Sequence, residues 1–88
     1  MDVVVKVEGG KMLRARGEVS DGRIASVTIT GDFFLHPEEA IESLETALVG
    51  AAHDREVLLA VVANELAGAT LVGATDDDIA DLLMMLSG

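Results

Sequence analysis

Apolar and polar residues alternate at the start of the chain with the period of two that marks a half-buried β-strand. Val3, Val5 and Val7 fall on one face of the first predicted strand, and Lys6 and Glu8 fall on the other. This alternation is typical of an antiparallel strand that has one face on the core and the other in water.

The same period continues after a predicted turn at Gly9-Gly10. A second strand runs to Asp21-Gly22, a favoured hairpin turn. A glycine inside a strand often marks a bulge, so Gly17 predicts one in this strand. The third strand has an apolar row at alternating positions: Ala25, Val27 and Ile29. We expect a three-stranded antiparallel meander with one face that needs cover.

The period changes to 3.6 after the segment Gly31-Asp32-Phe33-Phe34-Leu35-His36-Pro37. Gly31 suits a turn because it adopts positive φ, and Pro37 suits the first helical position because its missing N–H would be unpaired there. Gly50 predicts the end of this helix. The helix carries one apolar stripe: Ala40, Ile41, Leu44, Ala47 and Leu48. Its glutamates lie opposite and are expected to face water: Glu38, Glu42 and Glu45.

A second helix is predicted between Asp54, which suits the N-cap, and Gly68. From Val57 to Ala63 this helix is apolar almost all round, which is more than one core-facing stripe requires. The helix is therefore either central in the fold or covered on a second side by another chain.

The last part of the chain predicts a third helix. The segment from Ala69 to Ala74 before it fits either a crossing loop or a short strand. Thr75 and Asp78 have the spacing of a capping box, and Asp76, Asp77 and Asp78 suit the positive end of the helix dipole. The buried stripe is expected at four positions: Ile79, Leu82, Leu83 and Leu86. Residues 1–88 thus predict one α+β domain, a three-stranded antiparallel meander followed by two or three helices packed on one face.

The strand-to-helix junction holds both phenylalanines and the single proline of the chain. Phe33 and Phe34 are adjacent, so their side chains point to opposite sides of an extended backbone. One of them can pack in the core while the other faces a helix or a partner. A purely structural plug of the core is the alternative.

Composition narrows the function. The chain has 88 residues, a net charge of −10 and no cysteine, which excludes disulfides, thiolate metal sites and cysteine nucleophiles. From Pro37 onward eleven acidic residues face one basic residue, Arg55, and this surface disfavours a nucleic-acid partner. No apolar run approaches the roughly 18 residues of a membrane span, and no signal-peptide pattern opens the chain. We expect a cytoplasmic protein without a membrane partner.

Residues that would carry chemistry are few. The run Asp76–Asp78 lacks the ligand spacing and glycine of a calcium loop, which favours helix capping. His36 and His53 lack a second histidine at ligand spacing and a nucleophile arranged beside them. Gly9-Gly10-Lys11 lacks the glycine spacing of a phosphate-binding loop. We expect no catalytic, metal-binding or cofactor-binding residue in this chain.

Basic residues gather on the polar face of the predicted sheet. Lys6, Arg14 and Arg16 mark the place where an anionic ligand or an acidic partner would dock. Glu8 and Glu18 balance them, and a solvated sheet face is the simpler interpretation because exposed charges normally need no function.

Several segments share the pattern of a known family. They are Gly9-Gly10-Lys11, Asp21-Gly22-Arg23-Ile24, Thr30-Gly31-Asp32-Phe33-Phe34, Pro37-Glu38-Glu39-Ala40, Leu44-Glu45-Thr46-Ala47-Leu48-Val49-Gly50 and Leu71-Val72-Gly73-Ala74-Thr75. With them the chain resembles the C-terminal accessory domain of lipoate-protein ligases over nearly its full length, and Gly-Asp-Phe-Phe before an acidic helix is the specific part. The segment from Ala51 to Leu66 follows the family loosely.

The resemblance implies a non-catalytic role in protein lipoylation. In that family the catalytic domain binds ATP and lipoate, forms lipoyl-adenylate and passes the lipoyl group to a lysine of an acceptor protein. The small domain is implied to cap or reposition the active site for adenylation, and in some organisms it is a separate chain. Because Met1 leads directly into the first strand, we expect a stand-alone accessory subunit that forms a heterodimer with the catalytic subunit. ATP and lipoate would bind to that partner, and no cofactor to this chain.

The resemblance also directs attention to a surface. We expect the partner interface at Asp32, Phe33, Phe34, Leu35 and His36, with the apolar second helix as a further contact. The architecture resembles that of SufE and NifU-like iron–sulfur assembly proteins, but a chain without cysteine cannot share their chemistry. The competing hypothesis is a non-catalytic adaptor module that binds an unrelated partner.

Overall fold

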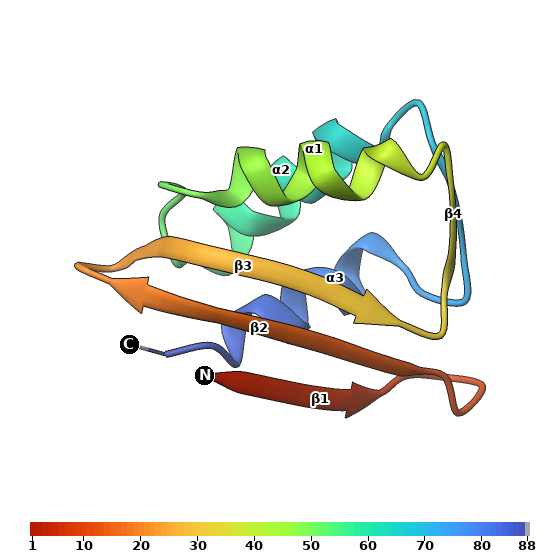
Figure 1. Ribbon diagram of the computed structural model, residues 1–88, viewed down its shortest axis with the longest axis horizontal. Helices are drawn as coiled ribbons and strands as arrows, with labels where there is room; N and C mark the ends of the chain where they lie inside the picture. Colours follow the sequence, from red (N-terminus) through yellow and green to blue (C-terminus); the bar gives the residue numbers. More distant parts are fainter. Residues whose placement is uncertain (88) are drawn as a thin grey trace.

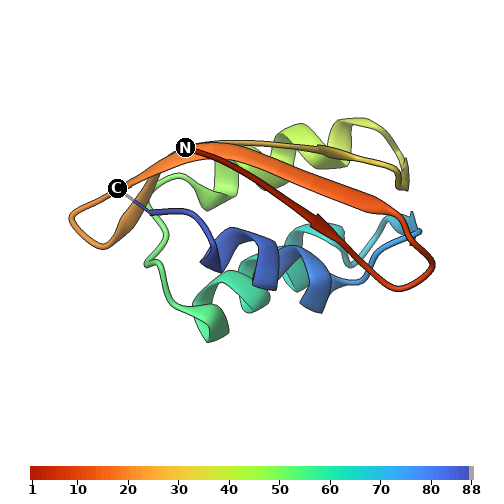
Figure 2. The ribbon, with the colours of Figure 1, turned by 90° about the horizontal axis from the view of Figure 1, so that it is seen from below.

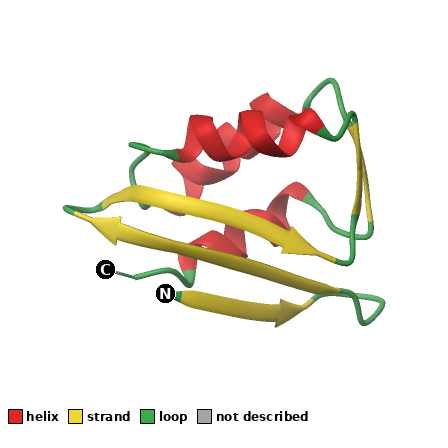
Figure 3. Ribbon diagram, in the orientation of Figure 1, coloured by secondary structure: helices red, strands yellow, loops and turns green. Residues whose placement is uncertain are grey.

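A computed structural model describes residues 1–87 and shows the predicted α+β fold (Figures 1 and 3). The elements in chain order are β1 (Asp2–Lys6), β2 (Met12–Ser20), β3 (Arg23–Gly31), β4 (Phe34–His36), α1 (Glu39–Leu48), α2 (Arg55–Leu66), β5 (Thr70–Val72) and α3 (Asp76–Met84). β1, β2 and β3 pair antiparallel in that spatial order, as predicted. β4 and β5 form a second, two-stranded sheet that the sequence pattern did not predict.

The helices cover one face of the three-stranded sheet and leave the other open. α3 packs against β1 and β2, α1 packs against β3, and α2 packs against both other helices. Figure 2 shows α2 and α3 together on one side of the sheet, with α1 beside β3. No helix within residues 1–87 combines the length and apolar character needed to cross a membrane.

The core lies between the sheet and the helices. Both the sheet and the helices contribute fully buried aliphatic side chains. Removing the apolar surface of these side chains from water is the main driving force of folding. The largest of them are Leu13, Ile24, Leu44, Leu48, Leu58, Val62, Ile79, Leu82, Leu83 and Leu86. The four residues predicted as the buried stripe of the third helix are therefore all buried, although Leu86 lies beyond the end of α3.

The apolar row of β3 differs from the predicted one. The β2–β3 register shifts after Glu18, which pairs with Ser26, because the next pair is Val19 with Ile24. Ala25 is thus the extra residue of a bulge, and its side chain is exposed while that of Ile24 is buried. The prediction that Ala25 belongs to the buried row was wrong because the bulge reverses the alternation.

Gly17 does not form the bulge predicted for it. It pairs regularly with Val27, and a Cβ atom on Gly17 would lie 2.1 Å from the carbonyl oxygen of Ser26. The glycine is required by a close approach of two backbones, which is the other common reason for glycine in a strand.

α1 begins slightly later than predicted. The regular helix starts at Glu39, and Pro37 precedes it, following a cis peptide bond with His36. The carbonyl of Pro37 accepts a hydrogen bond from the amide of Ala40 (3.1 Å), so the first turn forms before the regular helix. Gly50 has φ of +88° just beyond the helix, as expected of a C-terminal cap.

Two residues of α1 lie on different sides from those predicted. Ala47 is exposed, so it does not belong to the buried stripe. Glu45 is partly buried, and its Oε2 accepts a hydrogen bond from the amide of Ile29 (2.7 Å). Because β3 is an edge strand, this carboxylate satisfies a backbone donor that would otherwise lack a partner.

α2 packs against both other helices, but it is not enclosed by the core on all sides. Leu58, Val62 and Leu66 face the core, whereas Val57, Ala60 and Ala63 are exposed. Asp54 is its N-cap and accepts a hydrogen bond from the amide of Val57 (3.2 Å), as predicted. The apolar excess of this helix therefore faces outward.

The capping box at the start of α3 is confirmed. The hydroxyl of Thr75 accepts from the amide of Asp78 (3.1 Å), and the Asp78 carboxylate accepts from the amide of Thr75 (2.9 Å). Thr75→Ala removes the hydroxyl half of the box, and we expect it to lower the free energy of unfolding by about 1 kcal/mol. Urea denaturation measures this loss. Thr46→Ala, on the exposed side of α1, is the control and should cost nothing; equal stability of the two variants would contradict the prediction.

Candidate partner interface

The segment predicted as the partner interface lies in a small ribbon formed by β4 and β5. Phe34 pairs with Val72, Leu35 with Leu71, and His36 with Thr70. The segment from Ala69 to Ala74, which the sequence left open between loop and strand, therefore contains a strand. Figure 1 shows the ribbon at the end of the molecule where β3 ends and α1 begins.

The two faces of the ribbon differ in burial. Leu35 is buried and Leu71 is half-buried, so this face belongs to the core. On the opposite face Phe34 is 59% exposed and Val72, directly across from it, is 57% exposed. The His36 ring lies nearly parallel to the Phe34 ring, with 6.4 Å between their centroids. We name Phe34, His36, Thr70 and Val72 the ribbon face.

Phe33 and Phe34 point to different environments, as the extended backbone predicted. Phe33 is half-buried and packs against the core, whereas Phe34 lies mainly in solvent. A large aromatic side chain in solvent is a common anchor for a partner.

Asp32 has a structural role in the same segment. Its amide donates to the carbonyl of Met12 (2.8 Å), and its Oδ2 accepts from the amide of Met12 (3.2 Å). Gly73, with φ of +97°, lies so close that a Cβ atom would be 3.0 Å from the Asp32 carbonyl oxygen. These contacts fix the ribbon to the start of β2.

The five predicted interface residues thus divide by environment. Phe34 and His36 are exposed, Phe33 and Leu35 contribute to the core, and Asp32 holds the backbone. Thr70 and Val72 were not predicted, although they join Phe34 and His36 on one surface. They were missed because the sequence Thr70-Leu71-Val72 is polar, apolar and apolar in order, and it therefore lacks the alternation that identifies the faces of a strand.

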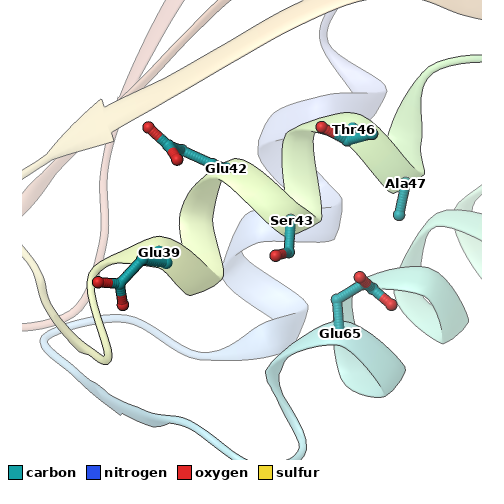
Figure 4. Close-up of a pocket in the computed structure, with 6 residues that line it drawn as sticks. All are labelled: Glu39, Glu42, Ser43, Thr46, Ala47 and Glu65. Carbon is teal, nitrogen blue, oxygen red and sulfur yellow. The ribbon is translucent and has the colours of Figure 1, made fainter.

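An acidic groove lies between α1 and α2. It has a volume of about 440 Å³ and is lined by Glu39, Glu42, Ser43, Thr46, Ala47 and Glu65. Figure 4 shows Ser43 of α1 and Glu65 of α2 on facing sides of it, with Glu42 directed away. Within residues 1–87 no group of three or more His, Cys, Asp or Glu residues is placed to hold a metal ion. The groove is a patch of negative surface, consistent with the charge of this half of the chain.

The open face of the three-stranded sheet carries the basic residues, as predicted. Arg14, Arg16, Thr28 and Thr30 line a shallow hollow of about 240 Å³. Asp2 balances the arginines: its Oδ1 accepts from Nε of Arg14 (2.8 Å), and its Oδ2 lies 3.5 Å from Nη2 of Arg16. The predicted balance by Glu18 is wrong, because the Glu18 carboxylate binds the amino terminus (2.6 Å).

This ion pair gives the sheet a response to acid. The hydrogen bond from Arg14, together with the charges of Arg14 and Arg16, lowers the pKa of Asp2 from 3.8 to about 2. The stabilisation is therefore fully present above about pH 4 and is lost as the pH falls through about 2. We expect Asp2→Asn to have a lower Tm than the wild type at pH 5, with the difference shrinking toward pH 2 and in about 1 M salt. A difference independent of pH would contradict this assignment.

His53 has a structural role. Its ring is half-buried, and Nε2 donates to the carbonyl oxygen of Leu83 (2.9 Å), which ties the start of α2 to α3. Arg55 supports the same contact by binding Asp81 (2.7 Å) and Asp77 (3.0 Å).

Fold and surface together define a small α+β domain with an exposed apolar ribbon face and an acidic helical surface. The chain belongs to the family described as the bacterial lipoate protein ligase C-terminus, whose model matches residues 4–83. The resemblance seen in the sequence motifs is thereby confirmed.

A solved structure supports the fold. The chain is similar to one in the structural analysis of a bi-partite lipoate protein ligase and its E2 lipoyl domain from Thermoplasma acidophilum, with a TM-score of 0.76 and 24% sequence identity. The match covers 94% of this chain and 97% of the other. In a comparison with curated proteins, none matches this sequence.

Proposed function

We propose that this chain is an accessory subunit of a lipoate-protein ligase and is required, with the catalytic subunit, for ATP-dependent formation of lipoyl-adenylate. The family match over residues 4–83 carries this proposal. ATP and lipoate bind to the catalytic partner, and this chain contributes to the complex through its surface.

The proposal includes a heterodimer with a separate catalytic chain. The similar chain from Thermoplasma acidophilum comes from the analysis of a bi-partite ligase, and the structural match extends over 97% of that chain. A catalytic partner chain would account for the large exposed apolar side chain of Phe34 on the surface of this domain.

The ribbon face is the surface that we assign to the catalytic subunit. Phe34 and Val72 lie opposite each other on paired strands, so they form one continuous apolar patch. His36 and Thr70 add groups that donate and accept hydrogen bonds at its border. A buried aromatic anchor with a polar border is the arrangement that carries most of the binding energy in protein interfaces.

The test measures the adenylation half-reaction. Pyrophosphate release is followed with ATP, lipoate and the catalytic chain of the source organism, with and without this protein. We expect release only when both chains are present. Transfer of the lipoyl group from supplied lipoyl-adenylate is the control, because it shows that the catalytic chain is folded.

Equal pyrophosphate release without this protein would refute the role in adenylation. If the two chains also failed to bind each other, the adaptor hypothesis would replace the proposal, and an unrelated partner would occupy the ribbon face.

A further inference from the structure

A second apolar feature lies next to the ribbon face, where β3, β4 and α1 meet. Figure 1 shows the end of β3, β4 and the start of α1 at the same end of the molecule. Between them is a groove of about 330 Å³, at the lower end of the range of about 300–1,000 Å³ that is usual for ligand sites. Ile29, Phe33, Phe34, Leu35 and Ile41 supply its apolar lining. We name it the corner groove.

The charge at the corner groove is negative. Glu38 lines it, and Ile41 connects it to a neighbouring hollow that is lined by Glu38, Glu39 and Glu42. No residue that lines either hollow is basic. A ligand with an apolar group in the groove would therefore bind more tightly if it also carried a positive charge beside these glutamates. Opposite charges attract across a partly desolvated contact.

The edge of β3 offers backbone groups at the same place. The amide of Asp32 bonds to β2, so the alternate residues Ile29 and Gly31 direct their backbone groups to the outer edge. Glu45 binds the amide of Ile29. Among residues 1–87 and outside the β2–β3 ladder, the structure gives no hydrogen-bond partner for the carbonyl of Ile29 or the amide of Gly31. One residue of a parallel strand would donate to the first and accept from the second.

We propose that the corner groove binds an extended segment of the catalytic subunit, which places an apolar side chain in the groove and a Lys or Arg beside Glu38. The proposal rests on the proposed function, because it specifies what the catalytic subunit presents at the interface. Three features each select one property of that segment. The apolar lining selects an apolar anchor, the acidic border selects a positive charge, and the carbonyl of Ile29 with the amide of Gly31 selects an extended backbone.

The test compares charge reversals at two helix starts. The affinity of the full chain for the ligase catalytic subunit is measured by titration calorimetry at low and high salt. Glu38→Lys reverses the charge at the groove, and Glu56→Lys makes the same change at the exposed start of α2. We expect Glu38→Lys to weaken binding at least tenfold at low salt, with a smaller effect at high salt, and Glu56→Lys to change it less than twofold.

Ile41→Gln tests the apolar lining independently. We expect at least a tenfold loss of affinity, with an unchanged far-ultraviolet circular dichroism spectrum as the check on folding. If the wild type binds tightly and the two charge-reversal variants, Glu38→Lys and Glu56→Lys, bind equally well, the corner-groove proposal is overturned and the proposed function stays in place. Absence of binding by the wild type would overturn both.

Discussion

Gly17→Ala is expected to destabilise the domain strongly, although it adds only one methyl group. A Cβ atom at this position would lie 2.1 Å from the carbonyl oxygen of Ser26 and 3.0 Å from the Cα of Val27. Both are backbone atoms of β3, so the neighbour cannot move aside as a flexible side chain would. The strain must separate β2 from β3 at the centre of the sheet.

The expected loss is about 3 kcal/mol, at the upper end of the usual cost of overpacking. A domain of this size has a total stability of about 4–13 kcal/mol, so the change removes a large part of it. The corresponding fall in Tm is about 12–24 °C. Calorimetric or spectroscopic melting of the two proteins measures it.

Gly68→Ala is the matched control. Among residues 1–87 no atom other than those of Gly68 and its chain neighbours lies within 4 Å of a Cβ built on it, and its φ does not lie in the left-handed region. Alanine there should be neutral or stabilise by about 0.4–1 kcal/mol, because it restricts the unfolded chain. Equal melting temperatures for the two variants would mean that β2 and β3 do not approach as closely as described.

The sequence predicted those elements whose signals are local. Alternation over Val3, Val5 and Val7 identified β1, and the Thr75–Asp78 spacing identified the start of α3, because each pattern is complete within a few residues. The adjacent Phe33 and Phe34 also revealed that this segment has a buried and an exposed side.

The bulge at Ala25 depends on contacts that are distant in the sequence. It turns the backbone of Ile24 outward, so that its amide donates to Ala51 (3.0 Å) and its carbonyl accepts from Gly50 (2.7 Å). The residues next to Ala25 in the sequence do not indicate that Gly50 and Ala51 will bind here. Glu45 was placed wrongly for the same reason, since its hydrogen-bond partner, Ile29, belongs to another element.

The ribbon was missed because both of its strands are only three residues long. Such a segment is too short to show a period, and its pairing joins Phe34 to Val72 across two helices in the sequence. The candidate site could therefore be predicted on β4 but not on β5. Its surface exists only after the chain folds.

Phe34→Ala is expected to remove most of the affinity for the catalytic subunit and to leave the domain folded. The side chain is 59% exposed and shares its face with Val72, so its truncation should change the free energy of unfolding by no more than about 0.5 kcal/mol. An aromatic anchor at the centre of an interface contributes about 2 kcal/mol or more, which corresponds to a loss of affinity of about 30-fold. Titration calorimetry with the catalytic chain, and melting of the free variant, measure the two quantities.

Phe33→Ala is expected to differ from Phe34→Ala by its larger effect on the stability of the free domain. Because Phe33 packs against the core, its removal should cost about 2 kcal/mol of stability, less than for a fully buried ring. Because Phe33 also lines the corner groove, its removal should weaken binding as well, but less than Phe34→Ala does. Val49→Ala, an exposed truncation at the far end of α1, controls for a general loss of apolar surface and should change neither quantity. If both phenylalanine variants lose stability and neither loses affinity, the junction belongs wholly to the core and the partner binds another face, such as the open, arginine-bearing side of the sheet.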